Sequence, residues 1–202
     1  MMHLYLTRHG ETIENVTGIL QGHLPGTLTE NGRRQARNLE SELASKLKPD
    51  FLYCSDLGRA VETARLLNAD WQLPLFQSAL LRERDWGELT GLPISQIPAG
   101  PFPESVETID AMLRRAGLFL RQLCSTIGLD NQKVVVVSHG LFCRCLQSVT
   151  EGVPFRDVPR FLNAEVRHVV FSRPFSAQSS AKDDVEAVSY THLRAHETAA
   201  NL

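Results

Sequence analysis

Three short apolar segments constrain the fold most strongly. They span residues 4–6, 51–54 and 134–137, and the last consists of four consecutive valines. Strands in which apolar and polar residues do not alternate are buried on both faces, which is typical of a parallel sheet covered by helices. The sequence therefore predicts a mostly parallel central sheet, with a last strand expected over residues 167–171.

The residues between these segments predict helices. Apolar residues recur at steps of three and four over residues 29–48 and 105–124, and shorter helices are expected over 60–68 and 140–150. Pro49 is expected to stop the first of them. Residues 89–103 contain four prolines and are predicted to form a loop that covers one face of the domain. Helices that alternate with buried strands predict an α/β fold of three layers, α/β/α.

The chain divides into one domain and a tail. Its 202 residues suffice for one sizeable core and are few for two ordinary domains, so we predict a single domain over residues 1–172. Residues 173–188 are rich in Ser, Ala and charged residues and are predicted to be a disordered tail. Residues 189–202 resemble a translated sequencing adapter and are expected to be non-native, with the native C-terminus missing.

Charge and composition exclude several classes of partner. Lys and Arg number 21 against 23 Asp and Glu, so the chain has no overall basic field for a nucleic acid or an acidic membrane surface. No apolar run approaches the roughly 20 residues that cross a bilayer, and the first residues lack a signal-peptide pattern. Four unevenly spaced cysteines do not suggest a disulfide framework. A cytoplasmic protein is expected, and the sequence leaves a homodimer open.

Basic residues follow each of the three predicted strands. Arg8 and His9 follow the first, Arg59 the second and His139 the third. Ligands of open α/β sheets bind at the carboxyl ends of the strands, so we expect two guanidinium groups and two imidazoles to meet there. The planar fork of an arginine matches the geometry of a phosphate group. The sequence therefore predicts a site for a compact dianion such as phosphate.

The motifs around these residues resemble a known family. The first reads Leu-Thr-Arg-His-Gly-Glu-Thr over residues 6–12, and further matching segments span residues 28–36, 55–64, 81–91 and 137–140. In this order they resemble the histidine phosphatase superfamily, with its phosphoglycerate-mutase-like fold. The resemblance covers about residues 3–171. It implies a phosphate-ester enzyme that needs no cofactor and no metal.

The resemblance also implies a role for each matching residue. His9 matches a nucleophile that becomes phosphorylated, and Glu83 matches the general acid and base. The residues expected to bind the phosphoryl group are Arg8, Asn15, Gln21, Gly22, Arg59, His139 and Gly140. A neutral imidazole is nucleophilic near pH 7, whereas His139 is expected to act as a cation or a hydrogen-bond donor. Glu83 is expected to be partly buried or to have a dianionic neighbour.

The spacing favours one branch of the family. Glu83 and His139 lie 56 positions apart, which resembles the phosphatases, because the mutases generally carry a long insertion there. We therefore expect a metal-independent phosphomonoesterase of the histidine acid phosphatase type, acting on a small phosphorylated metabolite. A cofactor-dependent phosphoglycerate mutase and a non-catalytic phosphate-binding member remain the alternatives.

Several residues keep more than one interpretation. Cys54 and Arg59 are one residue too close for the Cys-x₅-Arg loop of a cysteine-based phosphatase, so that mechanism is disfavoured. Three other carboxylates, Glu11, Asp85 and Glu88, are rivals of Glu83 for the role of the acid. His23 follows Gln21 and Gly22 and could touch substrate, although a solvated loop histidine is slightly favoured.

Overall fold

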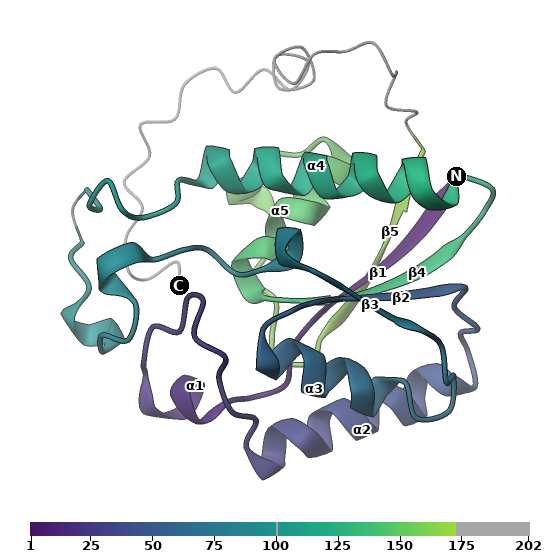
Figure 1. Cartoon of the computed structure of the whole chain (residues 1–202), viewed down its shortest axis with the longest axis horizontal. Coiled ribbons are helices and arrows are strands. Elements are labelled where there is room, and N and C mark those ends of the chain that lie inside the picture. Colours follow the sequence, from purple (N-terminus) through teal and green to yellow (C-terminus); the bar gives the residue numbers. More distant parts are fainter. Residues whose placement is uncertain (100, 173–202) are drawn as a thin grey trace.

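The computed structural model describes residues 1–99 and 101–172, so the predicted tail over 173–188 and the adapter-like residues 189–202 lie outside it. A single five-stranded sheet forms its centre (Figure 1). The strands are β1 (Met2–Arg8), β2 (Phe51–Ser55), β3 (Leu75–Ser78), β4 (Lys133–Ser138) and β5 (Val166–Phe171). Their order is β3-β2-β4-β1-β5, and only the pairing of β5 with β1 is antiparallel. The predicted mostly parallel sheet is confirmed.

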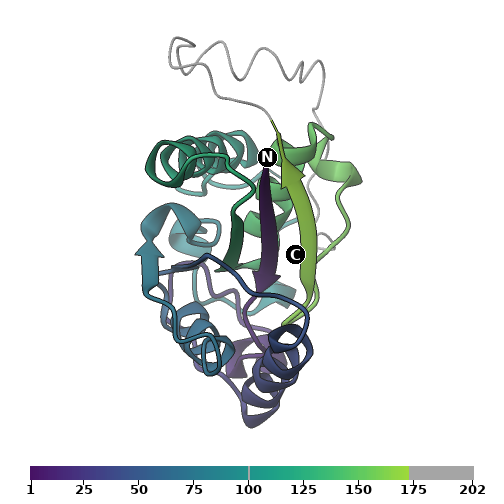
Figure 2. The same cartoon turned by 90° about the vertical axis from the view of Figure 1, so that its right-hand side faces the viewer.

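Helices cover both faces of this sheet. They are α1 (Ile13–Thr17), α2 (Glu30–Ala44), α3 (Gly58–Leu67), α4 (Ile109–Ile127) and α5 (Gly140–Glu151). Short 3₁₀ helices are η1 (Ala79–Leu81), η2 (Gly87–Leu89), η3 (Ile94–Gln96) and η4 (Phe155–Asp157). α4 and α5 lie on one face and α2 and α3 on the other, as Figures 1 and 2 show. The three-layer α/β/α architecture is thus confirmed.

The valines of β4 explain why its sequence is apolar throughout. Val134 and Val136 pack into the core under α4 and α5, whereas Val135 and Val137 pack against α2 and α3. All four side chains are fully buried. Successive side chains of a strand point to opposite faces, so a strand between two helical layers has no polar position.

The ends of two long helices differ from the prediction. α4 begins at Ile109 because the side chain of Thr108 accepts a hydrogen bond from the backbone N–H of Ala111 and caps the helix. Val106, which the sequence placed in this helix, instead packs beside Trp86. α2 ends at Ala44, before the predicted stop at Pro49. Sequence reasoning also missed α1, which is five residues long, and β3, a short edge strand.

A helix that spans a membrane has to be both long and apolar. α4, at 19 residues, carries Asp110, Arg114, Arg115 and Arg121. Within residues 1–99 and 101–172, no helix is both long enough and apolar enough to span a bilayer.

Candidate active site

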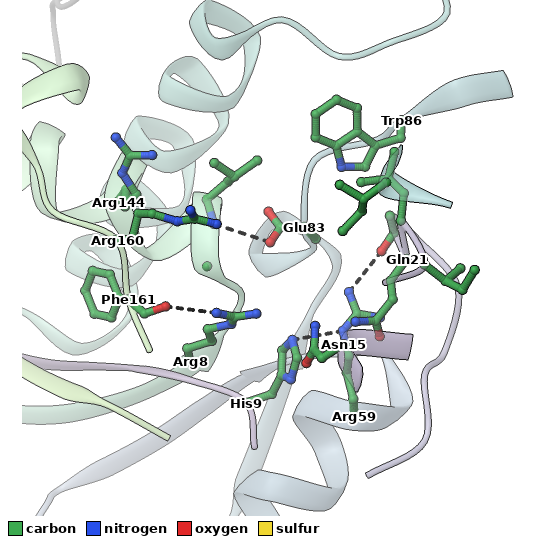
Figure 3. Close-up of a pocket in the computed structure, with 16 residues that line it drawn as sticks. Arg8, His9, Asn15, Gln21, Arg59, Glu83, Trp86, Arg144, Arg160 and Phe161 are labelled. Carbon is green, nitrogen blue, oxygen red and sulfur yellow. Dashed lines mark hydrogen bonds between the residues drawn. The ribbon is translucent and has the colours of Figure 1, made fainter. Parts of the chain in front are cut away.

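The carboxyl ends of β1, β2 and β4 open into one pocket (Figure 3). Eight of the nine residues predicted to form the site line it: Arg8, His9, Asn15, Gln21, Gly22, Arg59, Glu83 and Gly140. The ninth, His139, is fully buried, and its ring lies 5.3 Å from that of His9, centroid to centroid. The structure therefore brings all the predicted residues together from separate strand ends.

The ring of His9 is oriented by hydrogen bonds at both of its nitrogens. Its backbone N–H donates to the carbonyl of Ser138 over 3.0 Å, which fixes the end of β1 against β4. In the ring, Nδ1 lies 2.7 Å from the carbonyl of Gly10 and must donate a proton to it. Nε2 accepts a hydrogen bond from Nε of Arg59 over 3.1 Å. The lone pair of the neutral ring is thus on Nε2.

The surroundings of His9 keep its imidazole neutral. The side chain is only 2% exposed, and burial lowers its pKa well below the ordinary value. The positive charges of Arg59 and Arg8 lower this pKa further. His9 is therefore unprotonated at neutral pH, the form that a nucleophile requires.

Arg59 is fixed by carbonyl groups as well as by His9. It lies in the first turn of α3, and its terminal nitrogens donate to the carbonyls of Leu24 and Gly22. Gly22 has a φ of +48°, and a Cβ atom there would lie 2.9 Å from Oγ1 of Thr90, so both conformation and space favour glycine. Burial lowers the pKa of Arg59 to about 10, which leaves the side chain cationic at neutral pH.

Unpaired polar atoms converge on the pocket. Arg8 donates to the carbonyl of Phe161 over 2.9 Å, but its Nε has no partner within the described part of the chain. The same holds, among the described residues, for both ring nitrogens of His139 and for Oε1 of Gln21. A buried polar group without a partner costs about 1–3 kcal/mol, and such groups call for an explanation. The unpaired donors, Nε of Arg8 and the N–H of His139, point to an anionic ligand, whereas the amide oxygen of Gln21 is an acceptor.

The burial of His139 decides the charge of its ring. Its pKa lies well below the ordinary value because of burial, and the charge of Arg59 adds to this effect. The ring is therefore neutral in this state and can donate one N–H hydrogen bond. The sequence left a cation or a hydrogen-bond donor open for His139, and in this state the lowered pKa favours the neutral donor.

Glu83 is half-buried, as the sequence predicted, and faces His9 across the pocket (Figure 3). One carboxylate oxygen accepts from the backbone N–H of Arg84 over 2.9 Å. The other accepts from the N–H of Leu141, over 3.3 Å, at the start of α5. These contacts fix the carboxylate beside the groups that are predicted to bind phosphate.

The rival carboxylates lie elsewhere. Glu11 accepts a hydrogen bond from the hydroxyl of Thr29 near the start of α2, and Glu88 is exposed. Asp85 lies 3.8 Å from Nδ1 of His23, behind Glu83. Among the carboxylates of the described residues, Glu83 alone lines the pocket, which favours it for the role of the acid.

His23 neither lines the pocket nor is a free loop residue. Its Nε2 lies 2.9 Å from the backbone carbonyl of Glu83 and donates to it. The ring lines a second cleft, together with Arg82 and Asp85. Both interpretations from the sequence miss this contact.

The sequence analysis also missed one wall of the pocket. Arg144, Arg160 and Phe161 line it from α5 and from the segment that precedes β5. Asn163, in the same segment, donates to the carbonyl of His9 over 3.1 Å and to Oδ1 of Asn15 over 3.2 Å. None of them lies in a matching motif. Residues 160–163 are recognised as part of the site only from their placement beside the end of β1, which the pairing of β5 with β1 sets.

The cysteines offer no alternative nucleophile. Burial raises the pKa of Cys54 to about 12, and it raises the pKa of Cys143 as well. Cys54 packs in the core under α2 and α3. A thiol held protonated at neutral pH is a poor nucleophile, so the structure disfavours the cysteine-based mechanism.

The two buried histidines predict a dependence of stability on pH. Because both pKa values are lowered on folding, the unfolded chain binds more protons below about pH 6.5, and the free energy of unfolding falls as the pH drops. The loss is at most about 1.4 kcal/mol per pH unit for each histidine. We expect His139→Gln to reduce this slope in urea unfolding curves recorded between about pH 7.5 and pH 5.5. An unchanged slope in the variant would contradict the burial of a neutral His139.

Comparisons with known proteins agree with this geometry. The family model described as histidine phosphatase superfamily (branch 1) matches residues 4–184. The uncharacterized phosphatase PhoE of Bacillus subtilis is 30% identical over 172 residues, which cover 83% of this chain and 87% of that protein. Phosphoglycerate mutase-like protein 4 of Arabidopsis thaliana is 33% identical over 178 residues, or 81% and 76% of the two chains.

A solved structure supports the same relationship. The α-ribazole phosphatase of Shigella flexneri superimposes with a TM-score of 0.74 at 29% sequence identity. The match covers 85% of this chain and 96% of that one. The similarity therefore extends over nearly the whole of the solved protein, and both phosphatases and a mutase-like protein are among the relatives.

Proposed function

Because this chain belongs to the histidine phosphatase superfamily (branch 1), we propose that it is a phosphomonoesterase that works through a phosphohistidine on His9 and needs no metal. One observation carries the proposal. Nε2 of the neutral His9 faces a pocket in which the buried Nε of Arg8 and the ring of His139 lack partners among the described residues. These are the groups that a phosphate dianion would satisfy.

The first step transfers the phosphoryl group to the enzyme. Nε2 of His9 attacks phosphorus, the bond from phosphorus to the ester oxygen breaks, and Glu83 gives a proton to that oxygen as the alcohol leaves. Nδ1–H of His9 stays bonded to the carbonyl of Gly10, which stabilises the charge that develops on the ring. Arg8 and Arg59 neutralise the charge on the equatorial oxygens.

The second step releases phosphate. The ionised Glu83 takes a proton from water, which attacks phosphorus, and the bond between phosphorus and Nε2 breaks. The free imidazole and the protonated Glu83 are then regenerated. This cycle uses one nucleophile, one acid and base, and a fixed set of donors, all of which line or adjoin the pocket.

The substrate we propose is a small phosphorylated metabolite. A phosphate held at His9 would place its alcohol part near Ile19, Trp86 and Ile94 on one side and Arg144 and Arg160 on the other. The α-ribazole phosphatase among the relatives is named for a substrate of this general class. The relative named as mutase-like keeps phosphoglycerate mutase as the second candidate, in which a second hydroxyl replaces water.

The first test is hydrolysis of para-nitrophenyl phosphate in the presence of EDTA, between about pH 5 and pH 8. We expect activity that EDTA does not reduce, together with a phosphoprotein that is stable in alkali and labile in acid, as a phosphohistidine is. Loss of activity in EDTA or the absence of the phosphoprotein would contradict the proposal. Turnover only with a bisphosphoglycerate would favour the mutase instead.

A further inference from the structure

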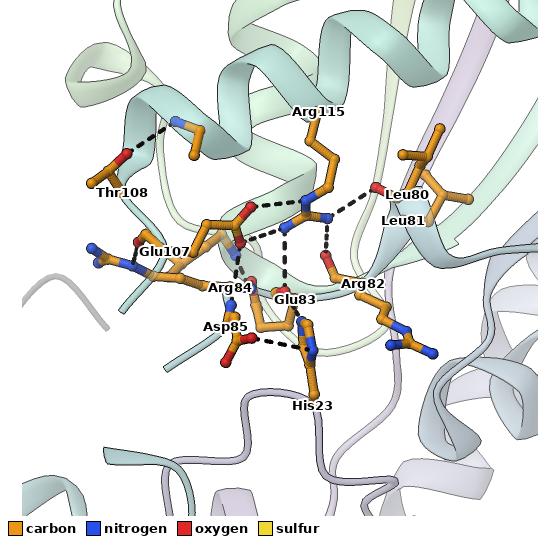
Figure 4. A network of polar contacts seen from close by, with 12 residues as sticks. His23, Leu80, Leu81, Arg82, Glu83, Arg84, Asp85, Glu107, Thr108 and Arg115 are labelled. Atoms are coloured by element: carbon orange, nitrogen blue, oxygen red, sulfur yellow. Dashed lines mark hydrogen bonds and ion pairs between the residues drawn. The ribbon is translucent and has the colours of Figure 1, made fainter. Parts of the chain in front are cut away.

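A half-buried polar network lies behind Glu83, outside the phosphate pocket (Figure 4). Its centre is Arg115 on α4, whose side chain is 17% exposed. A guanidinium has five N–H groups in one plane. In Arg115, NH1 donates to the carbonyls of Leu80 and Arg82, and NH2 donates to the carbonyl of Glu83. Nε and NH2 also donate to the carboxylate of Glu107, over 2.9 and 2.7 Å. All five groups are therefore used.

Glu107 ties the other side of Glu83 to the same network. One oxygen of its carboxylate accepts from the backbone N–H of Asp85 over 3.2 Å, and its own N–H donates to the carbonyl of Asp85 over 2.8 Å. Its carbonyl accepts from Nε of Arg84 over 2.6 Å. Residues on both sides of Glu83 are thus bound to one ion pair.

The same arginine contacts the helix that receives the carboxylate of Glu83. The guanidinium lies 4.2 Å from the ring centroid of Phe142 on α5, and the neighbouring Leu141 donates its N–H to that carboxylate. The backbone of Glu83 and its hydrogen-bond donor are consequently both packed on Arg115. Arg115 itself does not line the phosphate pocket; it lines the second cleft, with His23.

We propose that Arg115 and Glu107 form a positioning pair that sets where the carboxyl group of Glu83 stands relative to the leaving oxygen. The proposal rests on the role of Glu83 in the proposed function. The planar guanidinium of Arg115 binds three carbonyls and so fixes the segment from Leu80 to Glu83. A lysine would fix it less tightly, because an ammonium group has three donors and no fixed plane. A displacement of about 1 Å at a catalytic group can cost about 100-fold in rate.

The test separates this role from a purely structural one. General acid catalysis matters most for an ester with a poor leaving group, and kcat/KM reports the step in which that group leaves. We expect Arg115→Lys and Glu107→Gln to lower kcat/KM for an alkyl phosphate at least about 10-fold more than for para-nitrophenyl phosphate. Inhibition by inorganic phosphate should stay within about twofold of the parent, because the pocket of Arg8 and Arg59 is untouched.

Matched controls come from the neighbouring residues. Arg114→Lys on the exposed side of α4 and Glu104→Gln on the surface should leave the ratio of the two substrates unchanged. Melting temperatures are measured for all variants, since a folding defect would lower the activity on both substrates together. An equal loss on the two substrates, or no loss, would overturn the positioning role.

A further variant distinguishes this proposal from the proposed function itself. If Glu83→Gln changes the substrate ratio and Arg115→Lys does not, Glu83 is the acid and the positioning pair is rejected. If Glu83→Gln leaves the ratio unchanged, the assignment of the acid has failed, and the positioning role falls with it.

Discussion

His9→Ala is expected to lower kcat/KM for any phosphate ester by at least about 10⁴-fold. In the proposed mechanism the other groups of the pocket bind the phosphoryl group, but none of them can accept it. Uncatalysed hydrolysis of phosphate monoesters is among the slowest reactions, and enzymes accelerate it by up to about 10²¹-fold. Without Nε2 of His9, water would have to attack the phosphate ester directly, in a pocket that is arranged for attack by the imidazole.

The fold should survive this substitution. Removal of the His9 ring leaves the backbone bond to Ser138 in place and abolishes the cost of burying an imidazole beside Arg59 and Arg8. The measurement is steady-state hydrolysis of para-nitrophenyl phosphate together with trapping of the phosphoprotein, with His168→Ala on β5 as the control. Activity of the His9 variant within about 10-fold of the parent would show that another group takes the phosphoryl transfer.

The sequence predicted those parts of the fold whose local pattern and tertiary role agree. The valines of β4 have to be apolar because both faces of the strand are covered, so the run of four is readable without a structure. His9, Arg59 and His139 follow strands or begin helices at the carboxyl edge of the sheet, where sequence position alone places them together.

Other features depend on contacts between distant segments. β3 has no apolar pattern of its own, because an edge strand is exposed, and it is held by pairing with β2. Asn163 reaches His9 only because β5 runs back along β1. In the sequence, Arg115 is one of several arginines on an amphipathic helix. Its hydrogen bonds to the carbonyls of residues 80, 82 and 83 depend on the packing of that segment against α4.

The protonation state of His139 could not be predicted from the sequence, for a different reason. Its identity and position were predictable, but its charge depends on complete burial and on the distance to two arginines. Neither quantity can be read from residue spacing. A neutral ring can still donate one hydrogen bond to an oxygen of the phosphoryl group, and an incoming dianion favours the protonated form.

Glu83→Gln is expected to have the second-largest effect, and its size should depend on the leaving group. A glutamine cannot give up a proton, so an alkoxide would have to leave without one, and kcat/KM for an alkyl phosphate should fall by about 10²–10⁴-fold. para-Nitrophenolate is a stable anion and needs little help, so the loss in kcat/KM for para-nitrophenyl phosphate should be much smaller. Both substrates are measured on the same preparation.

The amide of the Glu83→Gln variant also changes the local hydrogen bonds, so a second variant is needed. The carboxylate of Glu83 accepts from two backbone N–H groups, those of Arg84 and Leu141, whereas an amide has one accepting oxygen and cannot satisfy both. Glu83→Ala removes the side chain without placing an N–H against a donor. If both variants lose activity preferentially on the alkyl phosphate, the missing proton is the cause. If they lose it equally on both substrates, Glu83 supports the pocket but does not protonate the leaving group.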